Sequence, residues 1–171
     1  MRKQNIRICI AVLTLAPIFA QPALADDAQA DIDAGFVAFQ RGDIVAAMGH
    51  YTMAADAGSA EGQARLAWIL DQSEQNEEAV KWYRASADQG HSGGQYGLGE
   101  MYAKGEGVEK DESLAVEYFV LAADNGHAQS QRVLINAYEK GLLGLTVDLE
   151  KAAALRHRLD VQQQAASEDV N

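Results

Sequence analysis

A ten-residue phrase recurs three times along the chain, each time with a glycine at its fifth position: AADAGSAEGQ, SADQGHSGGQ and AADNGHAQSQ. The glycines are Gly58, Gly90 and Gly126, so the phrases are 32 and then 36 residues apart. A period of this length is typical of stacked supersecondary units, none of which buries its apolar face alone. The repeat therefore constrains the fold more than any single motif does.

Apolar residues keep the same register around each glycine. Small and aromatic residues precede it at helical spacings, and a leucine follows it by eight residues. The sets are Ala47, Tyr51, Ala54 and Leu66, then Ala79, Tyr83, Ser86 and Leu98, then Ala115, Phe119, Ala122 and Leu134. These spacings predict helices and not strands. We expect each unit to be a nearly antiparallel helix pair, in which the glycine ends the second helix and small alanines let the backbones approach to about 8 Å.

The first 25 residues have the pattern of an export signal. Three basic residues precede an apolar run at 8–20, and a small-x-small triplet ends at Ala25. The run is shorter than the roughly 20 residues that span a bilayer. We therefore expect a signal peptide over 1–25 that is cut between Ala25 and Asp26, with an uncleaved anchor helix as the alternative.

Removal of this signal would change the composition of the chain. The single cysteine and both prolines precede residue 26, so the mature chain would form no disulfide. It would keep 11 basic and 25 acidic residues, a net charge of −14 with histidine neutral. Such a chain repels nucleic acid and anionic lipid, so we expect neither nucleic-acid binding nor membrane insertion after cleavage.

The stretch LGEMYAKGEGVEKDESLAVEYFVLAADNGH, residues 98–127, resembles the Sel-one-like repeat, a relative of the tetratricopeptide repeat. The positions that match the pattern of that family are Leu98, Gly99, Tyr102, Gly105, Gly107, Val108, Asp111, Ala115, Tyr118, Phe119, Ala122, Ala123 and Gly126. The first unit is closer to a tetratricopeptide repeat, the second lacks the glycine-rich loop, and the last lacks the terminal glycine.

This resemblance implies an all-α fold, an α-solenoid of about four antiparallel helix pairs over residues 26–164. Residues 165–171 would form a disordered tail. Terminal units of such a solenoid are expected to be irregular because they meet water.

No motif for chemistry emerges, and we expect no catalytic residue, cofactor or metal. His91 and His127 occupy equivalent positions in adjacent repeats, about 10 Å apart. Because a zinc–nitrogen bond is about 2 Å, we interpret these histidines as turn residues. The glycine-rich segment 93–99 lacks the Lys-Ser/Thr of a P-loop and is interpreted as a softened helix. Asp111 is expected to stabilise a helix start.

The resemblance implies that the first helix of each pair lines a concave groove suited to a peptide or a helix. The groove candidates are Glu61, Arg65, Trp68, Asp71, Tyr96, Glu100, Lys104, Gln129, Arg132, Asn136 and Glu139. Trp68 and Tyr96 are the expected anchors, because aromatic residues often dominate binding energy. Burial between repeats is an equal alternative for Trp68, whereas Tyr96 is expected to be exposed.

The function that follows is a non-catalytic periplasmic or secreted adaptor for a protein partner. The resemblance implies a bacterial envelope role, with the periplasmic part of a membrane protein or an envelope complex as the partner. Two alternatives stay open at this point: an enzyme acting on β-lactam or cell-wall substrates, and a structural envelope subunit that assembles with itself. Cysteine-rich relatives linked to β-lactams have a disulfide in each repeat, which this chain would lack.

Overall fold

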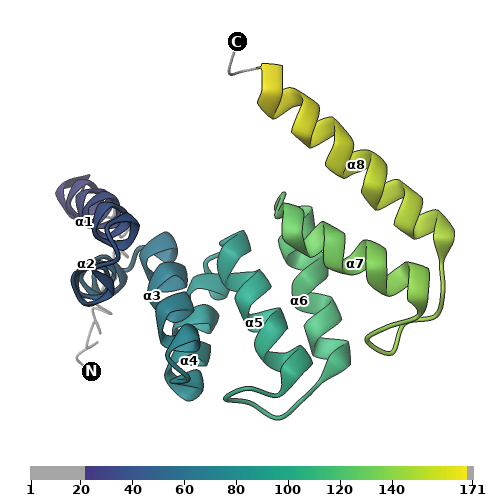
Figure 1. Ribbon diagram of the computed structural model, residues 1–171, viewed down its shortest axis with the longest axis horizontal. Helices are drawn as coiled ribbons and strands as arrows, with labels where there is room; N and C mark the ends of the chain where they lie inside the picture. Colours follow the sequence, from purple (N-terminus) through teal and green to yellow (C-terminus); the bar gives the residue numbers. More distant parts are fainter. Residues whose placement is uncertain (1–21, 169–171) are drawn as a thin grey trace, which may run out of the picture.

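Eight α-helices and no strand make up residues 22–168, the part of the chain that the computed structural model describes. The helices are α1 (Pro22–Gln40), α2 (Ile44–Asp56), α3 (Ala60–Gln72), α4 (Asn76–Asp88), α5 (Ser92–Lys104), α6 (Glu112–Asp124), α7 (Ala128–Lys140) and α8 (Leu149–Glu168). They pack as four successive hairpins that follow one another in a curved row (Figure 1). The expected all-α solenoid of four helix pairs is confirmed.

One short motif ends a helix and starts the next at three points. Gly58, Gly90 and Gly126 follow α2, α4 and α6 with φ of 87°, 80° and 83°. At the middle point the N–H of Gly90 donates to the carbonyl of Ala87 at 2.8 Å, and the N–H of His91 donates to that of Ser86 at 3.2 Å. This left-handed termination is what glycine tolerates best. Because His91 is also the N-cap of α5, no linker separates the two helices.

Small residues sit where the helices cross. Ala47, Ala79 and Ala115 are fully buried, and Tyr83 and Phe119 fill the space between successive hairpins. The glycines of α5 belong to the same packing, because Gly94 and Gly97 lie against Ser86 and Tyr83 of α4. α5 is a helix throughout, as expected, and its glycines permit a close approach of α4 that the sequence did not predict.

Buried glutamines of α3 and α5 bond to residues at the ends of second helices. Gln63 donates from Nε2 to the carbonyl of Ala55, at the end of α2, and accepts from Nε2 of Gln89 at 2.8 Å. In the next hairpin, Oε1 of Gln95 accepts from Nδ2 of Asn125 at 2.9 Å. A buried amide without partners costs free energy, and Gln63 and Gln95 each accept a hydrogen bond from the residue that ends their own hairpin.

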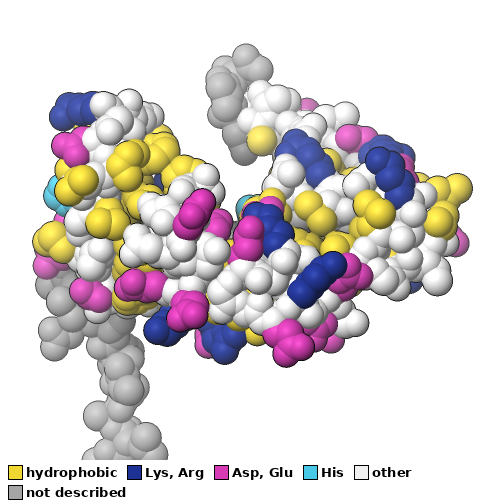
Figure 2. Space-filling model, turned by 60° about the horizontal axis from the view of Figure 1, so that its bottom comes forward, with side chains coloured by type: hydrophobic (Ala, Val, Ile, Leu, Met, Phe, Trp, Pro, Cys, Tyr) yellow, Lys and Arg dark blue, Asp and Glu magenta, His cyan; other side chains and the backbone are white. Residues whose placement is uncertain are grey.

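The first hairpin has no described repeat in front of it. Val37 occupies the position that Ile69 and Met101 take in the next two repeats, where both are buried. Val37 is instead 42% exposed. Figure 2 shows hydrophobic side chains on the surface of this end of the molecule, on the left, and also at the opposite end, with acidic and basic side chains intermingled between them.

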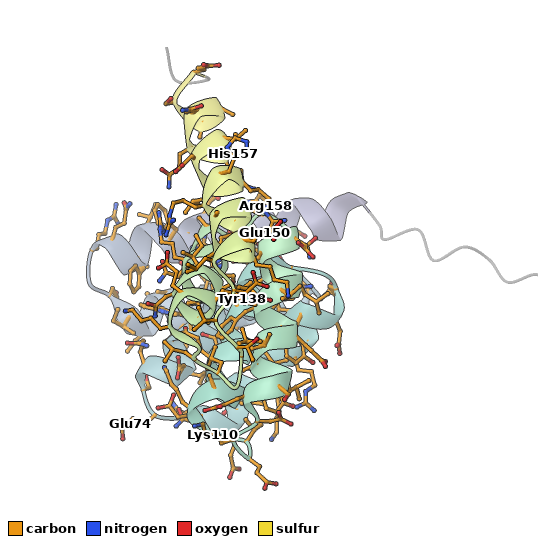
Figure 3. All side chains as sticks on the ribbon, turned by 90° about the vertical axis from the view of Figure 1, so that its right-hand side faces the viewer. Glu74, Lys110, Tyr138, Glu150, His157 and Arg158 are labelled. Atoms are coloured by element: carbon orange, nitrogen blue, oxygen red, sulfur yellow. The ribbon has the colours of Figure 1, made fainter. Side chains whose placement is uncertain are left out.

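The last hairpin is looser and ends in a longer helix. α8 packs on α7 through Ala152 and Leu159, and Arg158 pairs with Asp124 of α6 at 2.9 Å. Its C-terminal part extends beyond the other helices (Figure 3). α8 continues to Glu168, so it includes the first four residues of the segment expected as a tail.

The chain ends fall partly outside the described residues. Positions 1–21 of the expected signal peptide and positions 169–171 are not described. The expected cleavage point between Ala25 and Asp26 lies within α1, which begins at Pro22.

Candidate partner-binding groove

A groove of about 740 Å³ crosses the successive hairpins. Its walls come mainly from α1, α3 and α5, with the start of α7 at one end. These are the first helices of the hairpins, as expected for the inner side of a curved solenoid.

One wall of the groove is aromatic. Phe36 and Phe39 of α1 and Trp68 of α3 line it, and the rings of Phe39 and Trp68 meet edge to face with centroids 5.4 Å apart. Phe36 is 44% exposed and Trp68 is 45% exposed. Of the two alternatives for Trp68, the exposed one is found. Contiguous exposed aromatic surface of this kind is unusual unless a ligand or partner covers it.

A paired arginine lies beside the aromatic wall. The Nε of Arg65 donates to Oε1 of Glu61 at 2.8 Å, and the guanidinium lies 5.7 Å from the ring centroid of Phe36 and 5.8 Å from that of Tyr51. Burial alone would lower the pKa of Arg65, but the hydrogen bond and charge of Glu61 outweigh it, so the pKa is raised. The guanidinium is therefore held in place and charged.

Tyr96 and Glu100 of α5 form another part of the lining. The ring centroid of Tyr96 lies 4.6 Å from that of His127 and 5.8 Å from that of Phe119. Tyr96 is therefore half-buried, whereas the sequence predicted that it would be exposed. Burial raises the pKa of Tyr96, and the charge and hydrogen bond of Glu100 raise it further. Contacts with the core thus hold this side chain in the lining.

Two histidines complete the lining and cap the groove helices. Nδ1 of His91 accepts the N–H of Gly94 at 3.2 Å, and Nδ1 of His127 accepts that of Ser130 at 3.3 Å. Burial is the main cause that lowers the pKa of both histidines. A neutral ring supplies the acceptor that the start of each helix requires.

The repeats match a known family along most of the described chain. A family model, "Sel1 repeat", matches residues 35–59, 60–91, 92–127 and 136–155. The chain belongs to the Sel1 repeat family. Proteins of this family are commonly protein-interaction scaffolds.

Two curated proteins share parts of the Sel1 repeat region. An exopolysaccharide production negative regulator from Rhizobium leguminosarum bv. viciae is 33% identical over 93 residues, which cover 47% of this chain and 35% of the regulator. An F-box protein from Arabidopsis thaliana is 35% identical over 82 residues, covering 47% of this chain and 23% of that protein. The matches thus span about a third or less of each relative.

Two solved structures have the same architecture. A Sel1 repeat protein from Oxalobacter formigenes superposes with a TM-score of 0.72 at 25% identity, covering 82% of this chain and 59% of that one. The protective antigen c5321 of uropathogenic Escherichia coli strains, which displays an SLR fold, superposes with a TM-score of 0.70 at 31% identity. That match covers 83% of this chain and 32% of the antigen.

The structure brings six of the eleven sequence candidates to the groove. They are Glu61, Arg65, Trp68, Tyr96, Glu100 and Gln129. The other five, Asp71, Lys104, Arg132, Asn136 and Glu139, do not line it. Asp71 and Lys104 lie near the C-terminal ends of their helices, and only the start of α7 reaches the groove. Glu139 is instead paired with Arg156 of α8.

Sequence reasoning missed Phe36, Phe39 and the two histidines. A signal for Phe36 was available, because it precedes Trp68 by 32 residues, as Trp68 precedes Glu100. The three residues therefore occupy one position on successive Sel1 repeats. The histidine caps had a weaker signal: histidine is not among the preferred N-cap residues, but His91 and His127 occupy the position that Ser59 has in the preceding repeat.

Residues 22–168 show neither a cluster of metal ligands nor a helix that could cross a membrane. No three histidine, cysteine, aspartate or glutamate side chains in this part come together as metal ligands would. None of its helices combines the length and the apolar composition that crossing a membrane requires.

Proposed function

We propose that this Sel1 repeat chain is a non-catalytic scaffold whose groove binds a peptide or helical segment of a protein partner. The observation that carries the proposal is the aromatic wall of Phe36, Phe39 and Trp68, in which Phe36 and Trp68 are exposed, inside a groove of about 740 Å³. Aromatic side chains in a concave, partly dry site are the usual anchors of a protein interface.

The partner segment carries large apolar side chains and basic residues. The apolar side chains pack on the aromatic wall, and the basic ones face Glu100 and the acidic surface of a chain whose net charge is −11. Charge of this sign steers a basic partner to the groove and weakens its attraction as salt is added.

The scaffold acts after export, in the periplasm or outside the cell. Support comes from the signal-like pattern of the first 25 residues. The partner is then the periplasmic part of a membrane protein or a component of an envelope complex. A regulatory role is consistent with the printed name of the Rhizobium relative, a negative regulator of exopolysaccharide production.

A peptide selection tests the groove directly. Phage carrying random 16-residue peptides are selected on residues 26–171, and the enriched peptides are labelled and titrated by fluorescence anisotropy. We expect enrichment of aromatic or large aliphatic residues together with lysine or arginine. Trp68→Ala and Phe36→Ala should each weaken binding by about tenfold or more, as removal of an anchor does.

The matched control is Leu121→Ala. Leu121 is a similarly exposed apolar residue on α6 that does not line the groove. Its loss should leave the affinity unchanged. Equal weakening by Leu121→Ala and Trp68→Ala, or no effect of either groove variant, would place binding elsewhere and contradict the proposal.

A further inference from the structure

We propose that His91 and His127 are acid-sensitive helix caps that weaken partner binding in the groove when the pH falls below neutral. Both side chains line the groove, and each holds the first turn of a groove helix. The effect on binding rests on the function proposed above. The titration of the caps requires no partner.

Each cap depends on one ring nitrogen. Nδ1 of His91 accepts the N–H of Gly94, and Nδ1 of His127 accepts the N–H of Ser130. The hydroxyl of Ser130 lies 3.1 Å from the same nitrogen of His127 and donates to it in this tautomer. Nδ1 accepts only when it carries no proton, so both caps require the neutral ring with its proton on Nε2.

Protonation removes the caps in two ways. It turns Nδ1 into a donor, which leaves an N–H of the first helical turn without its partner. It also places a positive charge at the N-terminus of α5 or α7, where the helix dipole is already positive. Both effects destabilise the part of the helix that forms the groove wall.

The chain contains a version of the same cap that does not titrate. Ser59 follows Gly58 just as His91 follows Gly90. Its Oγ accepts the N–H of Gly62 at 3.2 Å at the start of α3. A hydroxyl remains an acceptor across the physiological pH range. Serine therefore already forms this cap at the equivalent position of another repeat.

Burial is the main cause that lowers the pKa of both histidines. For His91, the charge of Glu61 from α3 opposes this lowering and that of Arg65 adds to it. For His127, the charge of His91 adds to the lowering. The titratable side chain packed on the ring of His127 is Tyr96 of α5.

These shifts fix the pH range of the effect. An unfolded histidine has a pKa of about 6.5. Because the folded pKa is lower, the unfolded chain takes up protons first as the pH falls. The stability that the neutral caps contribute is therefore complete above about pH 6.5 and is lost as the pH falls below it.

Protonation also changes the charge that a partner meets. Besides the two histidines, the charged side chains of the groove are Glu61, Glu100 and Arg65. Two imidazolium rings would add two positive charges among them. A basic segment attracted at neutral pH would then be repelled at the end of the groove where α5 and α7 begin.

The first experiment uses the protein alone. Thermal unfolding at pH 7.5 and pH 5.0 is compared for the wild type, His91→Ser/His127→Ser, and the control His157→Ser, which replaces an exposed histidine of α8. We expect the Tm of the wild type to fall by about 4 to 8 °C more than that of the double serine variant. His157→Ser should behave as the wild type. In NMR spectra, the amides of Gly94 and Ser130 should lose protection over the same pH range.

The second experiment uses a labelled peptide from the phage selection. The affinity is measured as the pH is lowered from 7.5 through the range in which the protein stays folded. We expect the wild type to bind about tenfold more weakly once the folded histidines are protonated, which their lowered pKa places below about pH 6.5, and the double serine variant to lose clearly less. The quantity compared is the ratio of the affinities at acidic and neutral pH for each variant, so a difference between variants at pH 7.5 does not affect the result.

The outcomes separate the two proposals. Equal Tm losses in the wild type and the serine variant would overturn the acid-sensitive caps, whether or not a peptide binds. Equal losses of peptide affinity would overturn the release of the partner while leaving the groove function intact. No peptide binding at pH 7.5 would overturn the proposed function, and the thermal data would still decide the caps.

Discussion

The ring of Tyr83 in α4 lies directly against the backbone of Gly97 in α5, with no room for a Cβ atom between them. Tyr83 is almost fully buried at this crossing of two successive hairpins. The distance between the repeats, and with it the width of the groove floor, is thus set by an aromatic ring facing a residue without a side chain.

Gly97→Ala should therefore destabilise the protein. The added methyl group forces the Tyr83 ring or the helix to move, and such overpacking costs about 1 to 3 kcal/mol. The free energy of unfolding in urea measures this loss. The control is Gly49→Ala, at an exposed position of α2 where a Cβ meets nothing within 4 Å. That change should stabilise by about 0.5 to 1 kcal/mol, and a result in which both variants behave alike would refute the close approach.

The hydrogen bond between Gln95 and Asn125 should be measurable as a coupling. In a double-mutant cycle with alanine at both positions, we expect a coupling of about 0.5 to 1.5 kcal/mol in the free energy of unfolding. Gln63 bonds to Gln89 instead, so Gln63→Ala and Asn125→Ala should be additive within about 0.5 kcal/mol. A coupling of the same size in both cycles would mean that the effect is not due to this bond.

Tyr83 should resist ionisation. Burial raises its pKa well above the usual value, and the charges of Asp71 and Glu100 raise it further. An unfolded tyrosine has a pKa of about 10, so the neutral folded form contributes stability that is complete below about pH 10 and is lost as the pH rises above it. In a titration followed by absorbance at 295 nm, Tyr83→Phe should remove part of the increase that occurs at the highest pH. The increase that begins at the lowest pH, which comes from more exposed tyrosines, should be unchanged. Loss of this first increase would contradict the burial.

The sequence predicted the helices because their signals are local. The glycines that end α2, α4 and α6 and the helical spacing of Ala47, Tyr51 and their equivalents act within one or two turns. A helix that ends in a left-handed residue and a helix with one apolar face each produce a recognisable local sequence pattern. The Asp111 side chain likewise accepts the N–H of Leu114 at 2.9 Å, which confirms the expected role at a helix start.

The groove was only partly predictable, because its lining depends on how each hairpin is rotated relative to the last. The register of Trp68 and Glu100 was sufficient to place both residues on its wall. It did not show that α7 contributes only its start, or that α8 draws Glu139 into an ion pair. Small rotations between repeats add up along a solenoid, so the error of a position-by-position transfer grows toward the last repeat.

By itself, then, the sequence determined that this chain is a row of helical hairpins, since turn chemistry and apolar spacing are properties of short segments. Only the tertiary structure decided that Phe36 and Trp68 stay exposed in one groove, that the α5 glycines admit the Tyr83 ring, and that two histidines cap the groove helices. These features depend on distances between residues that belong to different hairpins. Such distances are fixed when the hairpins stack, and no single repeat specifies them.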